Sequence, residues 1–464
     1  MRFLKISFRA SLYFIGFFLI ALTCYTEHYF GRVSLSQLLS TIQFGFSGVL
    51  LGDRQMIVWF VWRCIIGPLV ITIALMLAEH VFCKKNKLLK ITLPLVIVFL
   101  GCYQFCAHYH YAWRHHSEDD FKKQYVDPNT VSFNAKDKKN LIIIYVESLE
   151  NTYSDSRLFG HDLLHSLNDF KKNVISFNNF DELPGTGWTM AGWIASQCGL
   201  PFETRFASNV VGEHAHSFLP HAICLSDILA RAGYKSILMQ GSALSFAGAN
   251  HFIESHHYSE AYGLEEWKKQ NLPFNHGEVN SWGLSDHVLF QAAKLKLTTL
   301  MHEKKPFQLT LFTVDTHGPL ASIAPSCRAR GVNNFPGVVE CVADDVADFI
   351  RSIRKEDTFH NTVIFVMGDH LAKVNPVTDL LKTHHERTIF NLLISDKSFK
   401  KYTNHIDHFD IFPTLLDAIG FQYHGGQLGL GYSLLRPLIH SSDYLKKVAL
   451  IADENSVTYD RLWS

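Results

Sequence analysis

The first 110 residues contain three long apolar stretches, whereas the rest of the chain alternates short apolar runs with polar segments. The stretches are Ser11–Tyr25, Met56–Ala78 and Ile91–Ala107. A membrane-spanning helix needs ~20 mostly apolar residues, with ~17 as the short limit, so the second stretch qualifies by length alone. The pattern predicts a transmembrane region of about three helices over residues 1–112.

Basic residues flank these stretches unevenly, and this predicts their orientation. Arg2, Lys5 and Arg9 precede the first stretch, and a second cluster separates the other two: Lys84, Lys85, Lys87 and Lys90. Because cytoplasmic loops are enriched in Lys and Arg, both basic segments are expected in the cytoplasm. The residues after about Ala107 would then lie in the periplasm, carried by a multi-pass inner (plasma) membrane protein. A cleaved signal peptide is the alternative for the first stretch, but no Ala-x-Ala site follows it, so a retained anchor is favoured.

The remaining residues divide into a polar segment and a long region of strand-like runs. Residues 113–139 are polar and interrupted by Pro128, which predicts a linker. Residues 140–464 contain five short apolar runs separated by helix-length segments, at 141–147, 235–241, 307–315, 362–369 and 388–396. Such runs are typical of a parallel or mixed sheet covered by helices on both faces, so the predicted fold class is α/β.

Charge and cysteine content add two constraints. Lys plus Arg equals Asp plus Glu, at 43 each, so no overall basic field would attract nucleic acid. Five of the nine cysteines lie in or beside the apolar stretches: Cys24, Cys64, Cys83, Cys102 and Cys106. The other four predict two disulfides in an oxidising compartment, and closeness in sequence favours Cys198–Cys224 and Cys327–Cys341 over the other two pairings.

Three of the predicted strands end in carboxylates or imidazoles. Glu147 ends the first run, Asp315 and His317 follow the third, and Asp369 and His370 follow the fourth. In α/β sheets ligands bind at the carboxyl ends of the strands, where these side chains would meet. A lone Asp at a strand end is more often capped or solvated. Three corresponding positions instead favour a divalent cation such as zinc or manganese, whose binding offsets the desolvation of these groups.

A candidate nucleophile lies in the segment "PGTGWTMAGWIASQCGLP". "PGTG" predicts a turn and "TMAGWIASQ" a short helix, so Thr189 would stand at a helix amino terminus. The ordinary interpretation is an N-cap threonine. The functional interpretation is a nucleophile whose alkoxide is stabilised by the metal and the helix dipole, with Thr186 as the competing candidate. The segment alone favours the N-cap.

Several segments taken together resemble one enzyme family. They are "IIIYVESLE", the threonine segment above, "TVDTHGP", "GDHLA", "ICLSDIL", "QGSALSFAG" and "LGLGYSLL". As a set they resemble the membrane-anchored phosphoglycerol transferases of periplasmic glucan synthesis, in the lipoteichoic acid synthase-like branch of the alkaline phosphatase/sulfatase superfamily. Phosphoethanolamine transferases are more distant relatives. The resemblance extends from the apolar stretches to about Leu435.

The resemblance implies a fold, a site and a reaction. The fold would be a helical transmembrane region followed by a sulfatase-like periplasmic domain with a mixed sheet flanked by helices. Glu147, Thr189, Asp369 and His370 would ligate a divalent metal, Zn or Mn, and Thr189 would carry the transferred group covalently. His317 would contact phosphate or assist proton transfer. The donor would be phosphatidylglycerol or a related phospholipid and the acceptor a periplasmic or cell-surface glycan. The resemblance also supports the two favoured disulfide pairs.

The chain departs from the family pattern at several points. Ser245 stands where the family has an arginine, so a basic contact to the head group is missing or supplied elsewhere. The family's long carboxy-terminal extension does not follow Ser464, which leaves the acceptor open. His384 and His385 resemble the distal histidines of phosphoethanolamine transferases only loosely, and solvated surface histidines are the favoured interpretation.

Two alternative functions remain from the sequence. One is a phosphoethanolamine transferase acting on lipopolysaccharide, which would share the metal set and the nucleophile. The other is a catalytically inactive, lipid-binding sensor of the same fold, disfavoured because the whole metal set is present. A simple sulfatase or phosphodiesterase is a third choice, and three apolar stretches count against it.

Overall fold

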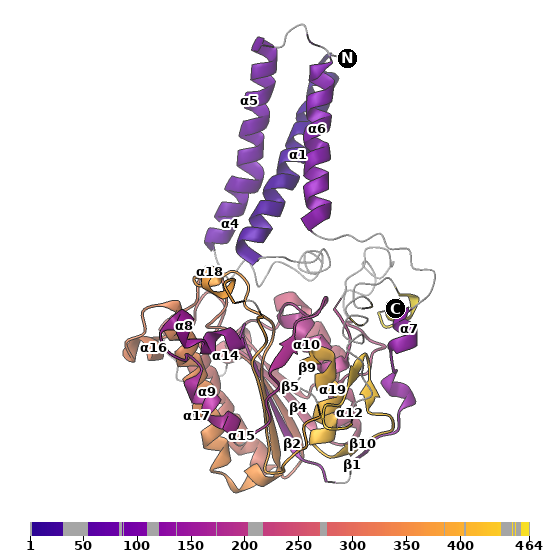
Figure 1. The fold of residues 1–464 in the computed structure, drawn as a ribbon, viewed down its shortest axis with the longest axis vertical. Coiled ribbons are helices and arrows are strands. Elements are labelled where there is room, and N and C mark those ends of the chain that lie inside the picture. Colours follow the sequence, from indigo (N-terminus) through magenta and orange to yellow (C-terminus); the bar gives the residue numbers. More distant parts are fainter. Residues whose placement is uncertain are drawn as a thin grey trace. The chain divides into compact units, whose positions relative to one another are not determined.

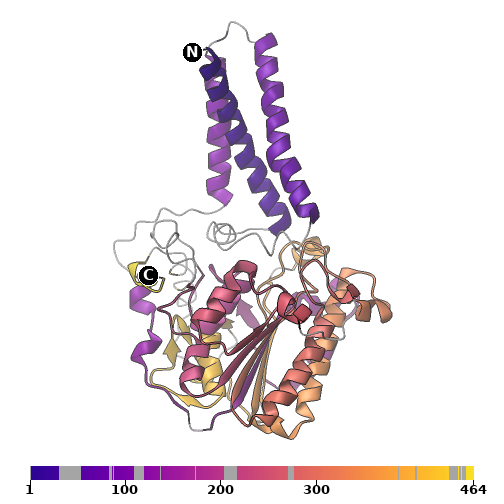
Figure 2. The same cartoon turned by 180° about the vertical axis from the view of Figure 1, so that it is seen from behind.

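The computed structural model describes most of the chain. The described residues are 2–30, 54–82, 86, 88–108, 120–135, 137–172, 174–202, 217–269, 276–384, 386–402, 405–437, 448, 451 and 456–463. They form two compact units, one containing the apolar helices and the other containing every described β-strand. Figure 1 labels many of these elements, and Figure 2 shows the same ribbon from behind.

The three apolar stretches are helical. Helix α1 is Arg2–Phe30, and the second stretch comprises α4 (Arg54–Phe60), the π-helical turn η1 (Val61–Ile66) and α5 (Gly67–Phe82), followed by α6 (Leu89–His108). Ile6–His28, Ile57–Phe82 and Leu89–His108 are long and apolar enough to cross a membrane. This confirms the predicted apolar helices, whereas Lys84, Lys85 and Lys87 lie outside the described residues.

Two kinds of contact join the apolar helices to one another. A Cβ added at Gly101 of α6 would lie 2.5 Å from the carbonyl oxygen of Gly16 in α1, so these helices approach at backbone distance. Near one end of the bundle, Glu79 of α5 forms an ion pair with Arg9 and accepts a hydrogen bond of 2.5 Å from the Tyr13 hydroxyl. The ion pair compensates the charge of Glu79, which is buried against α1.

The second unit is built on a six-stranded mixed sheet of order β5-β4-β6-β2-β7-β8. The strands are β2 (Asn140–Val146), β4 (Lys235–Gln240), β5 (Glu260–Tyr262), β6 (Phe307–Phe312), β7 (Thr362–Gly368) and β8 (Asn391–Ile394). All neighbours are parallel except β7 and β8. The five predicted strands are therefore confirmed, while β5 was not predicted because its three residues carry little pattern.

Helices cover both faces of this sheet, as predicted (Figure 1). Alternate residues of β2 enter two different cores: Ile143 and Tyr145 face one, Ile142 and Ile144 the other. The first core includes α10 (Thr189–Cys198), α12 (Leu225–Arg231), α13 (Ala249–Ser255) and α19 (His408–Ala418). The second includes α9 (His165–Asn168), α15 (Asp286–His302) and α17 (Phe335–Arg354). Because both faces are apolar, the strands read as continuous hydrophobic runs.

The remaining described elements are short. They are α7 (Asp120–Gln124), η2 (Pro128–Thr130), β1 (Asn134–Ala135), η3 (Asn151–Ser154), α8 (Ser156–Phe159), η4 (Asp169–Lys172), β3 (Asn179–Asp181), η5 (Phe246–Gly248), α14 (Leu264–Lys269), η6 (His276–Glu278), α16 (Pro325–Ala329), η7 (Asp357–Asn361), α18 (Thr378–Leu381), β9 (His405–Asp407), β10 (Phe421–Gln422), β11 (Gln427–Leu428), β12 (Gly431–Tyr432) and α21 (Val457–Asp460). In the segment expected as a linker, β1 pairs with β10, and Phe121 is buried against Tyr459.

Both favoured disulfides are present. Cys198–Cys224 joins the end of α10 to the start of α12, and Cys327–Cys341 joins α16 to α17. The pairing inferred from closeness in sequence is thus confirmed. Cys24, Cys64, Cys102 and Cys106 are free thiols, while Cys83 lies outside the described residues.

Candidate active site

Three of the predicted site residues converge at the carboxyl ends of two neighbouring strands. Val146 of β2 pairs in register with Gly368 of β7, so Glu147 and Asp369 leave the sheet side by side. One potential metal-ligating atom from each of Glu147, Asp369 and His370 lies within 4.8 Å of the other two. The Nε2 atom of His370 is 3.6 Å from Glu147 Oε1 and 3.3 Å from Asp369 Oδ2. Parallel pairing of β2 and β7 therefore brings together the residues of two of the three strand ends from which a cluster was predicted.

The hydrogen bonds within this cluster leave two atoms available to ligate a cation, one on Asp369 and one on His370. Asp369 Oδ1 accepts from the backbone N–H groups of Ser148 (2.8 Å) and His370 (3.0 Å), whereas its buried Oδ2 has no hydrogen-bond partner among the described residues. His370 Nδ1 lies 2.8 Å from the Leu371 carbonyl oxygen, which can only accept, so Nδ1 carries the hydrogen and Nε2 is available as a ligand.

Electrostatics also favour a cation at the cluster. Glu147, Asp369 and His370 are each at most 4% exposed. Burial, together with the negative charge of Asp369, raises the pKa of Glu147 to about 8. Two adjacent desolvated carboxylates repel each other unless positive charge compensates them. Carboxylate oxygens and an imidazole nitrogen are suitable ligands for zinc or manganese, so the residues present fit a divalent metal.

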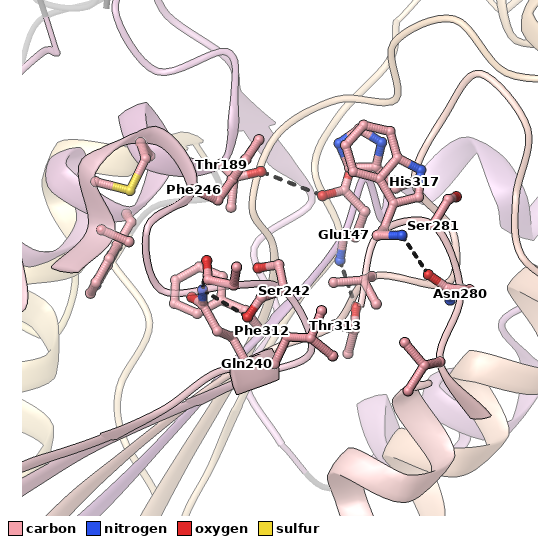
Figure 3. Close-up of a pocket in the computed structure, with 18 residues that line it drawn as sticks. Glu147, Thr189, Gln240, Ser242, Phe246, Asn280, Ser281, Phe312, Thr313 and His317 are labelled. Carbon is pink, nitrogen blue, oxygen red and sulfur yellow. Dashed lines mark hydrogen bonds between the residues drawn. The ribbon is translucent and has the colours of Figure 1, made fainter. Parts of the chain in front are cut away.

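Thr189 is the first residue of α10 and faces this cluster. Its hydroxyl lies 3.4 Å from Glu147 Oε2, to which it donates a hydrogen bond (Figure 3). The N-cap of α10 is Trp188 and not Thr189, so the ordinary interpretation of Thr189 as an N-cap is wrong. The competing Thr186 is fully buried and its hydroxyl donates to the Leu183 carbonyl at 2.7 Å, which is a turn contact.

Close packing sets the position of α10 relative to the strand end. A Cβ added at Gly192 would lie only 2.2 Å from the carbonyl oxygen of Asp369. The same carbonyl accepts a hydrogen bond of 2.8 Å from His408 Nε2. Glu182 also joins the segment before α10 to the segment after Asp369. Its carboxylate accepts hydrogen bonds from Leu371 N at 2.7 Å and from Lys373 Nζ at 3.1 Å. Thr189 is therefore held at a defined place beside Asp369.

A cavity of about 230 Å³ opens beside Thr189 and Glu147. Figure 3 shows its lining, which includes Gln240, Phe246 and His317. Among the described lining residues Glu147 is the one carboxylate, and none is Lys or Arg. The cavity is large enough for a small organic group attached to the threonine.

A family model described as Sulfatase matches residues 139–421, which is more than half of the chain. The chain belongs to the sulfatase family. Phosphoglycerol transferase I of Shigella flexneri is 34% identical over 358 residues, covering 75% of this chain and 45% of the relative. This sulfatase-family chain thus spans less than half the length of the curated relatives that it matches.

Two solved structures share the fold of this sulfatase-family chain. The lipoteichoic acid synthase LtaP from Listeria monocytogenes superimposes with a TM-score of 0.52 at 18% identity, covering 68% of this chain and 80% of that chain. The lipooligosaccharide phosphoethanolamine transferase A of Neisseria meningitidis, an integral membrane protein, gives a TM-score of 0.53 at 13% identity. The superposition covers 89% of this chain and 84% of the phosphoethanolamine transferase chain. These likenesses support the predicted alkaline phosphatase/sulfatase-like fold class.

The other residues singled out from the sequence lie outside the cluster of Glu147, Asp369 and His370. His317 lines the cavity. Ser245 does not line it and is exposed to solvent. Asp315 lies outside the metal-type cluster, because its oxygens accept from the Asn280 side chain (2.8 Å) and from Asp286 N (3.0 Å). His384 is partly buried, with Nε2 3.9 Å from Asp155 Oδ2, and His385 lies outside the described residues.

Sequence reasoning missed part of the cavity lining. Asn280 and Trp282 come from a turn that carries no catalytic motif, whereas Gln240 begins the segment "QGSALSFAG", which the resemblance included without giving Gln240 a role. The turn "NSWG" had one usable signal, a large aromatic residue next to a glycine in a polar segment. That pattern suits a solvent-facing turn equally well, so only the fold connects Trp282 with His317.

Proposed function

We propose that this chain is a membrane-bound phosphotransferase that moves phosphoglycerol from phosphatidylglycerol, or a related phospholipid, to a periplasmic or cell-surface glycan. The observation that carries the proposal is the hydroxyl of Thr189. Thr189 is the first residue of α10 but not its N-cap, so its hydroxyl is not used as a cap. The hydroxyl instead donates a hydrogen bond to Glu147, a member of the buried cluster. Similarity to phosphoglycerol transferase I supports the transferred group.

Glu147, Asp369 and His370, together with Thr189, would hold a divalent cation, Zn or Mn. Such a cation, when bound, neutralises phosphate oxygens and lowers the pKa of a neighbouring hydroxyl. The orphaned Asp369 Oδ2 and the available His370 Nε2 support this assignment. The start of α10 adds favourable partial positive charge beside the same oxygen of Thr189.

The reaction would proceed by two displacements at Thr189. In the first, Thr189 Oγ1 bonds to phosphorus, the bond to the diacylglycerol oxygen breaks, and the threonine proton leaves with diacylglycerol. In the second, an acceptor hydroxyl oxygen bonds to phosphorus, the bond to Oγ1 breaks, and the acceptor's proton returns to the threonine. Glu147 orients Oγ1 through its hydrogen bond. Two displacements at one residue predict ping-pong kinetics.

The apolar helices suit a lipid donor. Anchoring in the inner membrane would keep the site near phospholipid, and the basic residues that flank the helices support a periplasmic catalytic domain. A periplasmic site would meet glycan acceptors directly. It would also explain the disulfides, which form in oxidising compartments.

Mass spectrometry of the Thr189 peptide tests the proposal. The purified full-length protein is incubated with mixed phospholipids and digested. We expect the mass of a phosphoglycerol group on Thr189. A phosphoethanolamine mass would instead support the alternative transferase, and an unmodified Thr189 under turnover would overturn the covalent mechanism.

Metal content provides a second test. We expect about one equivalent of zinc or manganese in the full-length protein by elemental analysis, and loss of most of it in Asp369→Asn. The substitution removes the negative charge but can keep an oxygen for Ser148 N and His370 N. Asp315→Asn is the matched control, because Asp315 also follows a central strand yet lies outside the cluster, and it should keep its metal. A metal-free wild type would support the inactive sensor.

A further inference from the structure

The hydrogen bonding of His317 shows which way its ring can transfer a proton. Nδ1 lies 2.7 Å from the carbonyl oxygen of Gly318. A carbonyl oxygen can only accept, so Nδ1 carries the hydrogen and Nε2 of the neutral ring holds the free lone pair. Burial lowers the pKa of His317, which agrees with a neutral ring. His317 therefore presents an acceptor and is poorly suited to donate to a phosphate oxygen.

The Trp282 indole covers one face of this ring. The two ring centroids are 3.7 Å apart and the planes are inclined by 30°. Both residues line the cavity that Thr189 and Glu147 also line. Figure 3 labels His317, Thr189 and Glu147 in this lining. Stacking restricts rotation of the imidazole and keeps water from that face, so the hydrogen bond to Gly318 is protected.

The turn that carries Trp282 is itself tied to the His317 loop. Asn280 Oδ1 accepts from the backbone N–H groups of Trp282 (2.7 Å) and Gly283 (3.0 Å). Asn280 Nδ2 donates to Asp315 Oδ1 at 2.8 Å, two residues before His317. Gly283 has a φ of +148°, and a Cβ there would lie 2.1 Å from the carbonyl oxygen of Gly241. The position of the indole over the imidazole is therefore set by the backbone on both sides.

We propose that Trp282 is a positioning residue for His317, whose Nε2 accepts the proton of the acceptor hydroxyl in the second displacement. The inference rests on the proposed function and assigns that proton a route. As the acceptor oxygen bonds to phosphorus and the bond to Thr189 Oγ1 breaks, the hydroxyl proton moves to Nε2. The imidazolium then protonates the threonine oxygen, which restores the neutral ring and the free hydroxyl.

The test separates loading of Thr189 from its discharge. Full-length protein is loaded with phosphatidylglycerol, freed of lipid and mixed with a glucose disaccharide, and the modified Thr189 peptide is followed by mass spectrometry. For His317→Ala we expect discharge to slow by about 10²–10⁴-fold, the usual contribution of a general base. For Trp282→Ala we expect discharge to slow by about 10–100-fold through misplacement of the ring.

Three further variants make the result specific. Trp282→Phe keeps an aromatic face and should recover most of the discharge rate. Trp282→Ala combined with His317→Ala should discharge no more slowly than His317→Ala alone. If Trp282 acts only by positioning the His317 ring, its removal has no further effect once that ring is absent. Phe246→Ala, which alters another aromatic residue of the cavity, should instead add to the His317→Ala loss. Melting curves of all variants report on folding.

Two outcomes would overturn the inference in different ways. If Trp282→Ala slows discharge equally with and without His317, Trp282 only shapes the cavity. If the wild type never loads Thr189, the proposed function fails, and the role of Trp282 fails with it.

Discussion

Transfer should be abolished in Thr189→Ala while the protein stays folded. The variant lacks the oxygen that would bond to phosphorus in the proposed mechanism, so we expect turnover to fall by on the order of 10⁴-fold or more, as when other catalytic nucleophiles are removed. The fold should tolerate the change, because Trp188 and not Thr189 is the N-cap of α10. Even loss of a true cap costs only about 1 kcal/mol. Phospholipid turnover and thermal melting measure the two effects.

Two other hydroxyls serve as controls for this prediction. Thr186→Ala should retain the covalent adduct, because the Thr186 hydroxyl is bound to the Leu183 carbonyl in a turn. Ser148 is the stronger rival, since its hydroxyl donates to Glu147 Oε1 at 2.6 Å. Wild-type turnover in Thr189→Ala, accompanied by an adduct on Ser148, would move the nucleophile to that residue.

Gly192→Ala should also remove most of the activity, although Gly192 has no side chain that could take part. The new Cβ would lie 2.2 Å from the Asp369 carbonyl oxygen, so either α10 or the end of β7 must move. Movement on either side separates Thr189 from the cluster, and a displacement of about 1 Å can cost about 100-fold in rate. We also expect the free energy of unfolding to fall by about 1–3 kcal/mol from overpacking. Turnover and denaturant unfolding are the measurements.

Gly277→Ala is the matched control for this substitution. The nearest atom to a Cβ at Gly277 is 3.6 Å away, in Pro325, which is an ordinary contact. Its activity and stability should therefore stay near those of the wild type. Intrinsic helix propensity favours alanine over glycine in α10 by about 1 kcal/mol, so any loss of stability in Gly192→Ala would come from the contact with Asp369. A stable and active Gly192→Ala would contradict the prediction, because it would show that α10 can move away from Asp369 without loss of function.

The cluster was predictable because it depends on a regular feature of parallel sheets. Glu147 and Asp369 each end a continuously apolar run, and the carboxyl ends of parallel strands meet at one edge. Asp315 carried the same signal yet lies outside the cluster. The sequence does not reveal that Asn280 and Asp286 occupy its oxygens, since both belong to segments that come close only in the folded chain.

The amino-acid sequence by itself determined the apolar helices, the central strands, the disulfide pairs and the start of α10, because each follows from local periodicity or nearness along the chain. The tertiary structure alone decided the contact between Thr189 and Glu147, the seating of Gly192 on Asp369 and the stacking of Trp282 on His317. These contacts join residues far apart in sequence at distances set by side-chain packing, and a linear pattern contains no information about such distances.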